Sequence, residues 1–242
     1  MAVSVSTSSS REDKSSTTIK GRKGTVIEEI NRITDIMDST LTELIKFFED
    51  IDNVTIDKGV FGKKLGPDET IFFPCYLDAL DPGISKLVSD EIIDTSCWLC
   101  DAGAGDYRFV ALTAGKYKIP TIGIEYNPVL VEVGKDCISK LKQKSIIENI
   151  PIIIAQGDFT KDDVYNKYGM PFENIKTFFS FKTNQEGIAN KIARQSPTGT
   201  VFLFYTTVKE AQNFDGLNFE KTLNLPYPQF PDTYTYLHVY QK

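Results

Sequence analysis

The stretch from Cys97 to Asp106 holds the residues best suited to chemistry. It reads CWLCDAGAGD, an apolar run that ends in the acid Asp101 and is followed by two glycines, Gly103 and Gly105. Glycine has no Cβ and tolerates positive φ, so a backbone of this kind can approach a ligand closely. A helix that begins just after the turn directs its N-terminal amides toward that ligand. The pattern predicts a nucleotide-like ligand at the end of a buried strand.

The charge of Asp101 discriminates between nucleotide ligands. A dinucleotide fingerprint, G-x-G-x-x-G, places a pyrophosphate on the helix N-terminus, but Arg108 stands here at the third glycine position. A carboxylate before the turn repels a pyrophosphate and attracts a cation. S-adenosylmethionine, with its sulfonium, its α-amino group and no phosphate, fits this charge better. An NAD-type oxidoreductase is therefore disfavoured.

Two more acids follow the next two predicted strands. The segment 119–125 reads as a strand that ends in Glu125, 22 residues after Gly103, which is near the spacing of about 20 at which a carboxylate binds ribose hydroxyls. A third strand, 150–155, is followed by Asp158. Each acid alone has an ordinary alternative as a helix cap, a solvated strand end or a turn residue. Three acids at three successive strand ends favour a shared site.

The pattern Asp101-x-Gly103-x-Gly105-Asp106 resembles the first motif of the class I, seven-strand S-adenosylmethionine-dependent methyltransferases. The commonest family pattern has a further glycine where this chain has Tyr107. The resemblance spans roughly residues 70–242 and implies that Asp158 meets the adenine amine. The residues that the resemblance places around the cofactor are Asp101, Ala102, Gly103, Ala104, Gly105, Asp106, Glu125, Tyr126, Asp158, Phe159 and Tyr76.

The second half of the chain supports the same fold. Strands are predicted over 175–181 and 200–205 with a helix over 185–194 between them, and two strand-like stretches, 219–225 and 233–241, close the chain. A terminal pair of strands separated by prolines is a feature of the methyltransferase fold and not of a dehydrogenase. We therefore expect an α/β, three-layer, doubly wound seven-stranded sheet of order 3-2-1-4-5-7-6, with strand 7 antiparallel.

The methyl acceptor is less well defined. The segment 178–184, FFSFKTN, lacks the Asn/Asp-Pro-Pro-Tyr/Phe motif of base and glutamine methylation. Tyr107, Phe181 and Tyr205 are candidates for an aromatic methyl-transfer channel, with core packing as the alternative. The layout is similar to small archaeal protein-lysine methyltransferases, which makes a protein lysine the leading acceptor. Three alternatives stay open. The acceptor is RNA, the acceptor is a small molecule, or the protein is a binding module without catalysis.

Composition limits the possible size of the core and the possible partners. The chain has 242 residues, 41% hydrophobic content and a net charge of −6, so it can form a full core and shows no strong nucleic-acid signature. We expect a disordered polar tail over 1–24, a helical segment over 25–70 and a methyltransferase domain over 71–242. Four irregularly spaced cysteines favour a reducing, cytoplasmic location. No membrane span is expected.

Two local patterns remain. Cys97 and Cys100 form a C-x-x-C without a second pair, so we interpret them as structural strand residues and expect no metal. Phe73 and Pro74, in the aromatic segment that also contains Tyr76, are candidates for a wall at the methionine end of the cofactor, with ordinary burial as the alternative. The oligomeric state is not predicted.

Overall fold

A computed structural model describes residues 35, 37–52, 64–65, 70–227 and 230–242. The chain divides into two compact units, Met1–Asp38 and Ser39–Lys242, and the second contains everything discussed below. The predicted polar tail, 1–24, lies outside the described residues and stays a prediction. Among the described helices, none has the length and apolar character needed to cross a bilayer.

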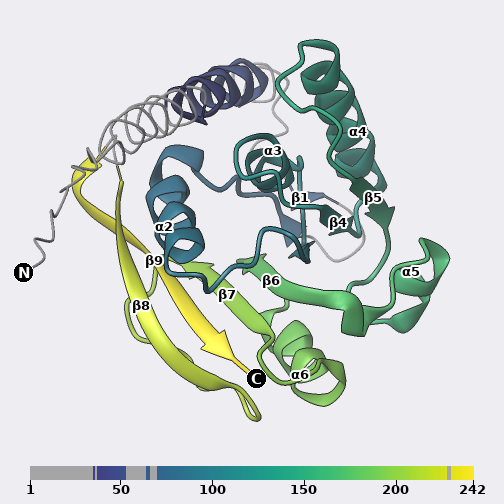
Figure 1. Cartoon of the computed structure of the whole chain (residues 1–242), viewed down its shortest axis with the longest axis vertical. Helices are drawn as coiled ribbons and strands as arrows, with labels where there is room; N and C mark the ends of the chain where they lie inside the picture. The colour runs from purple at the N-terminus through teal and green to yellow at the C-terminus, as the bar shows by residue number, and fades with distance from the viewer. Residues whose placement is uncertain (1–34, 36, 53–63, 66–69, 228–229) are drawn as a thin grey trace, which may run out of the picture. The chain divides into compact units, whose positions relative to one another are not determined.

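The core of the second unit is a seven-stranded sheet with strand order β5-β4-β3-β6-β7-β9-β8 (Figure 1). The first five strands in this order are parallel, and β9 pairs antiparallel with both β7 and β8. This is the methyltransferase order 3-2-1-4-5-7-6 with strand 7 antiparallel, which confirms the predicted fold. The strands are β3 (Trp98–Ala102), β4 (Thr121–Glu125), β5 (Ile152–Gln156), β6 (Ile175–Phe181), β7 (Val201–Thr206), β8 (Asn218–Tyr227) and β9 (Phe230–Gln241).

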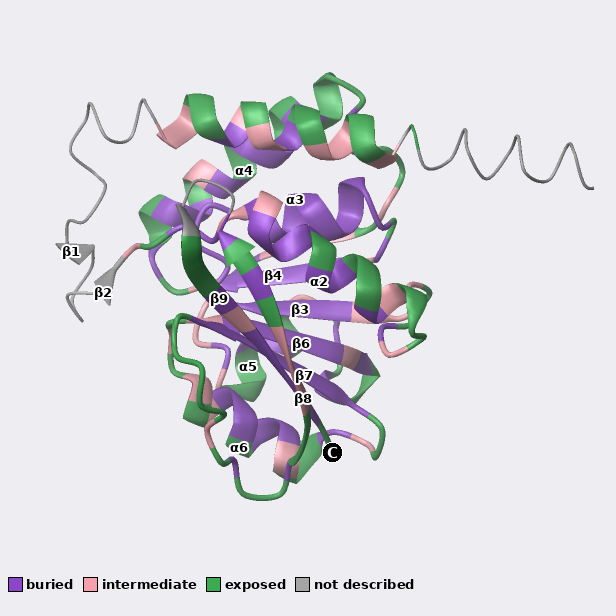
Figure 2. Cartoon of the chain, turned by 90° about the vertical axis from the view of Figure 1, so that its left-hand side faces the viewer, coloured by how far each residue is buried: buried purple, intermediate pink, exposed green. Residues whose placement is uncertain are grey.

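Helices cover both faces of the sheet because its central strands are apolar on both sides. All six residues of β7 are buried, for example, as Figure 2 shows, and strands buried on both faces are typical of parallel sheets. Residues 37–52 are also helical. Two short strands, β1 (Lys64–Leu65) and β2 (Thr70–Ile71), pair antiparallel with each other. The remaining helices are α2 (Leu77–Ser89), α3 (Arg108–Gly115), α4 (Pro128–Gln143), α5 (Asp162–Lys167), the short 3₁₀ helix η1 (Phe172–Asn174) and α6 (Gln185–Gln195).

Successive residues of each strand face different helices. Phe179 of β6 stacks on Phe109 of α3 with ring centroids 3.7 Å apart, so this side of the strand faces α3. Residues on the other side, such as Phe178, pack in a cluster with α5 and α6 that includes Val164 and Ile188. Asp101 pairs with Phe179 in the sheet and therefore lies on the α3 side. Its neighbours Cys100 and Ala102 belong to the cluster with α5 and α6. The alternation of the strand therefore selects which residues can reach the ligand side.

Two helix starts differ from the expected ones. A capping box at Thr40 predicts a restart of the helix, yet residues 37–52 form one continuous helix. The dipeptide Asp81-Pro82 is a typical helix opening, but α2 begins earlier, at Leu77, and Pro82 lies inside it. Capping signals mark positions where a helix can begin, and here the packing of Leu44, Phe48 and Leu80 in the core extends the helices past them.

Candidate functional site

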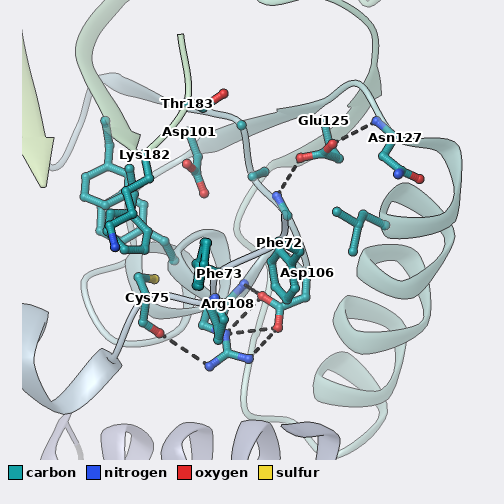
Figure 3. A pocket seen from close by; sticks show the side chains of 18 of the residues that line it. Phe72, Phe73, Cys75, Asp101, Asp106, Arg108, Glu125, Asn127, Lys182 and Thr183 are labelled. Atoms are coloured by element: carbon teal, nitrogen blue, oxygen red, sulfur yellow. Dashed lines mark hydrogen bonds and ion pairs between the residues drawn. The ribbon is translucent and has the colours of Figure 1, made fainter. Parts of the chain in front are cut away.

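A cavity opens at the carboxyl ends of β3, β4 and β6, and Figure 3 shows its lining from close by. Its empty volume, counting the part open to solvent, is about 930 Å³. In the sheet, β4 lies on one side of β3 and β6 on the other. The cavity therefore lies at the point where the strand order reverses, which is where open α/β sheets bind ligands.

The glycine turn after β3 is held by β4. Gly103, with φ of +90°, donates its N–H to the carbonyl of Ile124 at 2.9 Å, and Ala104 donates to the same oxygen at 3.0 Å. The N–H of Gly105 donates to Oε2 of Glu125 at 2.9 Å. Oε1 of Glu125 accepts from the N–H of Asn127 at 2.8 Å, which fixes the start of α4. Glu125 thus couples the turn to the next βα junction.

Asp101 is a buried carboxylate that lines this cavity. Its exposed fraction is 3%, and among the residues that the structure describes none donates a hydrogen bond to it or forms an ion pair with it. Burial raises the pKa of Asp101 well above its ordinary value, and the carboxylates of Glu125 and Asp106 raise it further. A buried charge without a partner is costly. The Asp101 carboxylate can therefore accept a hydrogen bond from a ligand or pair with a cationic group of a ligand.

Asp106, by contrast, is paired with Arg108. The guanidinium contacts Asp106 at 2.6–3.0 Å and Asp52, at the end of the helix 37–52, at 2.6 and 3.2 Å. It also donates to the carbonyl of Cys75 at 3.4 Å and lies 5.1 Å from the ring centre of Phe48. Burial alone would lower the pKa of Arg108, but the two carboxylates outweigh burial and raise it. Arg108 therefore ties the motif to the N-terminal helix.

Aromatic side chains form the rest of the wall. The ring of Phe72 lies against the glycine turn, so close that a Cβ on Gly105 would be 2.5 Å from it. Phe73 is 47% exposed and lines the cavity together with Phe181. The ammonium group of Lys182 lies 5.0 Å from the ring centre of Phe73 and 5.5 Å from that of Phe181. The cavity thus has an aromatic side at the end of β6.

The prediction that Tyr107 lines a channel is wrong. Its backbone has φ of +66° and its side chain is fully buried, away from the cavity. The ring fills the space above Gly123 of β4 and beside Gly134 of α4, where a Cβ on either glycine would overlap it. Its hydroxyl donates to the carbonyl of Ala155 at 3.3 Å. Tyr107 packs the sheet against α4.

Of the other candidates for the channel and the wall, three line the cavity and two do not. Phe181, Phe73 and Pro74 line the cavity. Tyr205 does not: it is fully buried behind Phe181, with ring centroids 4.8 Å apart. Tyr76 packs on Tyr227 at 4.5 Å and is also outside the lining. Tyr205 therefore packs against the aromatic wall from the core, as in the core-packing alternative, whereas Tyr76 packs on β8.

The cofactor candidates after β3 and β4 mostly converge on the cavity. Those in its lining are Asp101, Gly103, Ala104, Gly105, Asp106, Glu125, Tyr126 and Phe159. Ala102 faces the opposite layer. The side chain of Asp158 is outside the lining, where Oδ1 accepts from both the N–H and the hydroxyl of Thr160 at 2.8 and 2.7 Å. The adenine contact of Asp158 stays a prediction.

The cysteines near the site are structural in character. Cys100 is buried in β3, and Cys97 donates its thiol to Asp94 at 3.2 Å. Cys75 lines the cavity, but burial raises the pKa of its thiol, so it is protonated near neutral pH. Within the described ranges, no cluster of three or more His, Cys, Asp or Glu side chains could hold a metal ion.

Sequence reasoning missed Phe72, Asp52 and Lys182. Phe72 and Asp52 are far from the motif along the chain, and no local pattern connects them with it. Lys182 had a positional signal, because it follows β6 at the edge where the other strands place their acids.

Among the comparisons with known proteins, the one with solved structures finds similar folds. No protein-family model and no curated protein sequence matches the chain. A structure of MtNAS in complex with MTA and tNA is 14% identical, covers 86% of this chain and 70% of its own, and has a TM-score of 0.51. A mutant of MtNAS in complex with S-adenosylmethionine is 14% identical, with coverages of 88% and 74% and a TM-score of 0.49. An RNA methyltransferase from Salinibacter ruber, in complex with S-adenosyl-L-homocysteine, is 16% identical, with coverages of 71% and 93% and a TM-score of 0.48.

At these identities the likeness concerns the fold alone. Together with the strand order, it places the chain's architecture with the Rossmann-like methyltransferase fold.

Proposed function

We propose that this protein binds S-adenosylmethionine and transfers its methyl group to an acceptor. The observation that carries the proposal is Asp101, a buried carboxylate without a partner among the described residues, in a cavity at the switch point of a methyltransferase sheet. A ligand with an ammonium group provides the missing partner. A pyrophosphate ligand such as NAD would bring further negative charge to this position.

Each part of the cavity suits a part of that cofactor. Asp101 accepts the α-ammonium group. Glu125 uses one lone pair on each oxygen for the amides of Gly105 and Asn127, which leaves acceptor capacity for ribose hydroxyls. Phe159 and Leu130 supply an apolar surface for the base.

The bound cofactor supplies an activated methyl group on a sulfonium that is an excellent leaving group. The protein has to align the acceptor and exclude water. The aromatic wall of Phe73, Phe179 and Phe181 supplies a water-poor surface beside the cofactor. A catalytic base is not required for this chemistry when the acceptor arrives deprotonated. A protein lysine as that acceptor remains a prediction from sequence layout, and neither the fold nor the comparisons favour it over other acceptors.

Calorimetric titration of the full chain with S-adenosylmethionine, S-adenosylhomocysteine and NAD tests the proposal. We expect both sulfur ligands to bind and NAD to bind far more weakly. Absence of binding by both sulfur ligands at high protein concentration, or a preference for NAD, would refute it.

A further inference from the structure

The cavity has two chemically different ends. Glu125 stands at one end, over β4, and Lys182 stands at the other, at the end of β6, with Asp101 of β3 between them, as Figure 3 shows. The acidic end suits the amino and hydroxyl groups of the proposed cofactor. The acceptor must then enter from the β6 side of the switch point. Lys182 is therefore placed beside the acceptor and not beside the ribose.

The backbone directs the Lys182 side chain. Lys182 has φ of +47°, a left-handed conformation that is uncommon for residues other than glycine and is often found at functional sites. The next residue, Thr183, packs against the glycine turn, so that a Cβ on Gly103 would be 2.7 Å from its methyl carbon. This contact fixes the turn after β6 to the turn after β3. The position of Lys182 is thus set by the same glycine turn that lines the cofactor end.

Within the described part of the chain, no carboxylate neutralises the charge of Lys182. Two cationic side chains line the cavity, and Arg108 is already paired with Asp106 and Asp52. No ion pair involves Lys182 among the residues that the structure describes. Its ammonium group contacts the faces of Phe73 and Phe181 instead. Cation–π contacts hold the group in place but leave its N–H donors available.

This arrangement selects by charge. An acceptor that presents an ammonium group meets a like charge from Lys182, as well as the sulfonium of the proposed cofactor. An acceptor with an anionic group gains a charged hydrogen bond and can pack its apolar part on the two rings. We propose that Lys182 is a specificity-determining residue that selects a small acceptor with an anionic group, such as a carboxylate, near the methylated atom. The inference rests on the proposed function and narrows its acceptor class.

The test uses the full chain saturated with S-adenosylhomocysteine, whose own titration is done first. Binding of benzoate, phenyl phosphate, neutral benzamide and cationic benzylamine is then measured by ligand-observed NMR. The variants are Lys182→Gln, the charge-conserving Lys182→Arg, and Lys142→Gln as a control at an exposed lysine of α4.

We expect an anionic probe to bind the wild type more tightly than benzamide and benzylamine. Lys182→Gln should weaken it about five- to tenfold, less than the loss of a buried charged hydrogen bond because Lys182 is exposed to solvent, while Lys182→Arg and Lys142→Gln retain it. The preference between benzoate and phenyl phosphate tells a carboxylate from a phosphate acceptor.

Several results would overturn the inference. These are equal binding of charged and neutral probes, no binding of any anion, or a preference for benzylamine. Weaker binding of S-adenosylhomocysteine by Lys182→Gln, with probe binding unchanged, would assign Lys182 to the cofactor's carboxylate instead. Failure of the wild type to bind S-adenosylhomocysteine would refute the proposed function itself, so the two failures are distinguishable.

Discussion

We predict that binding of S-adenosylmethionine depends on the protonation of Asp101. Burial, with the nearby carboxylates of Glu125 and Asp106, raises the pKa of Asp101 well above its ordinary value in the free protein. An ammonium group against the carboxylate stabilises the ionised form and lowers that pKa. Cofactor binding should therefore release a proton at a pH below the raised pKa, and affinity should increase with pH. Asp101→Asn removes the titrating group while keeping its size.

The expected magnitudes follow from one charged hydrogen bond. Such a bond contributes about 1.5–3 kcal/mol, so Asp101→Asn should weaken binding of S-adenosylmethionine about 10- to 150-fold. The same variant should make the free protein more stable at neutral pH. The folded pKa of Asp101 lies above its unfolded value, so the wild type loses stability as pH rises between the two values. Asparagine avoids that loss.

The assay is calorimetry between pH 5.5 and pH 7 in two buffers with different ionisation enthalpies. In this range the ligand's α-amino group stays protonated, because its pKa is about 7.7–8.0. A buffer-dependent heat for the wild type, absent in Asp101→Asn, is expected. Urea unfolding of both free proteins provides the stability comparison. Buffer-independent heats for the wild type, or wild-type affinity in the variant, would refute the reasoning.

Glu125, His238 and the packing around Tyr107 allow three more predictions. Glu125→Gln replaces one acceptor oxygen with an N–H₂ that faces a backbone amide, so affinity for S-adenosylhomocysteine should fall about tenfold; calorimetry showing wild-type affinity would contradict this. Burial lowers the pKa of His238 below its ordinary 6.5, so the unfolded chain takes up a proton first as pH falls. The stability advantage of the wild type over His238→Gln should therefore shrink in urea unfolding from pH 7.5 to pH 5.5, and a constant difference would argue against it. Gly134→Ala places a Cβ into the ring of Tyr107 and should cost about 1–3 kcal/mol of unfolding free energy, whereas the helical Gly115→Ala, with contacts of 3.5 Å, should be near neutral.

The fold could be predicted from the sequence because its signals are local. Apolar runs define the parallel strands, the first three of which end at acids or glycines, and the strand over 175–181 matches β6 residue for residue. The proline-separated terminal pair indicated the antiparallel β9. Strand ends also placed Asp101 and Glu125 at one edge of the sheet, because parallel strands share their carboxyl ends. Side chains alternate in direction along a strand, so Asp101 lines the cavity whereas Ala102 faces the opposite layer.

The direction of Tyr107 could not be read from its place in the motif. A residue in the glycine turn seemed to belong to the cavity, but φ of +66° turns its side chain into the layer below α4. The available signal was Gly123, because a glycine in the middle of a strand marks the close approach of another group. The ion pair of Arg108 with Asp52 joins residues 56 positions apart and depends on tertiary packing alone.

The Tyr107 ring also has an evolutionary consequence. Tyr107 occupies a position where the resembled family most often has glycine, and two glycines, Gly123 and Gly134, stand opposite its ring. The three positions share one volume, so the effect of a substitution at one depends on the residues at the other two. A search motif that demands glycine at position 107 would therefore not match this chain, although its sheet has the same strand order.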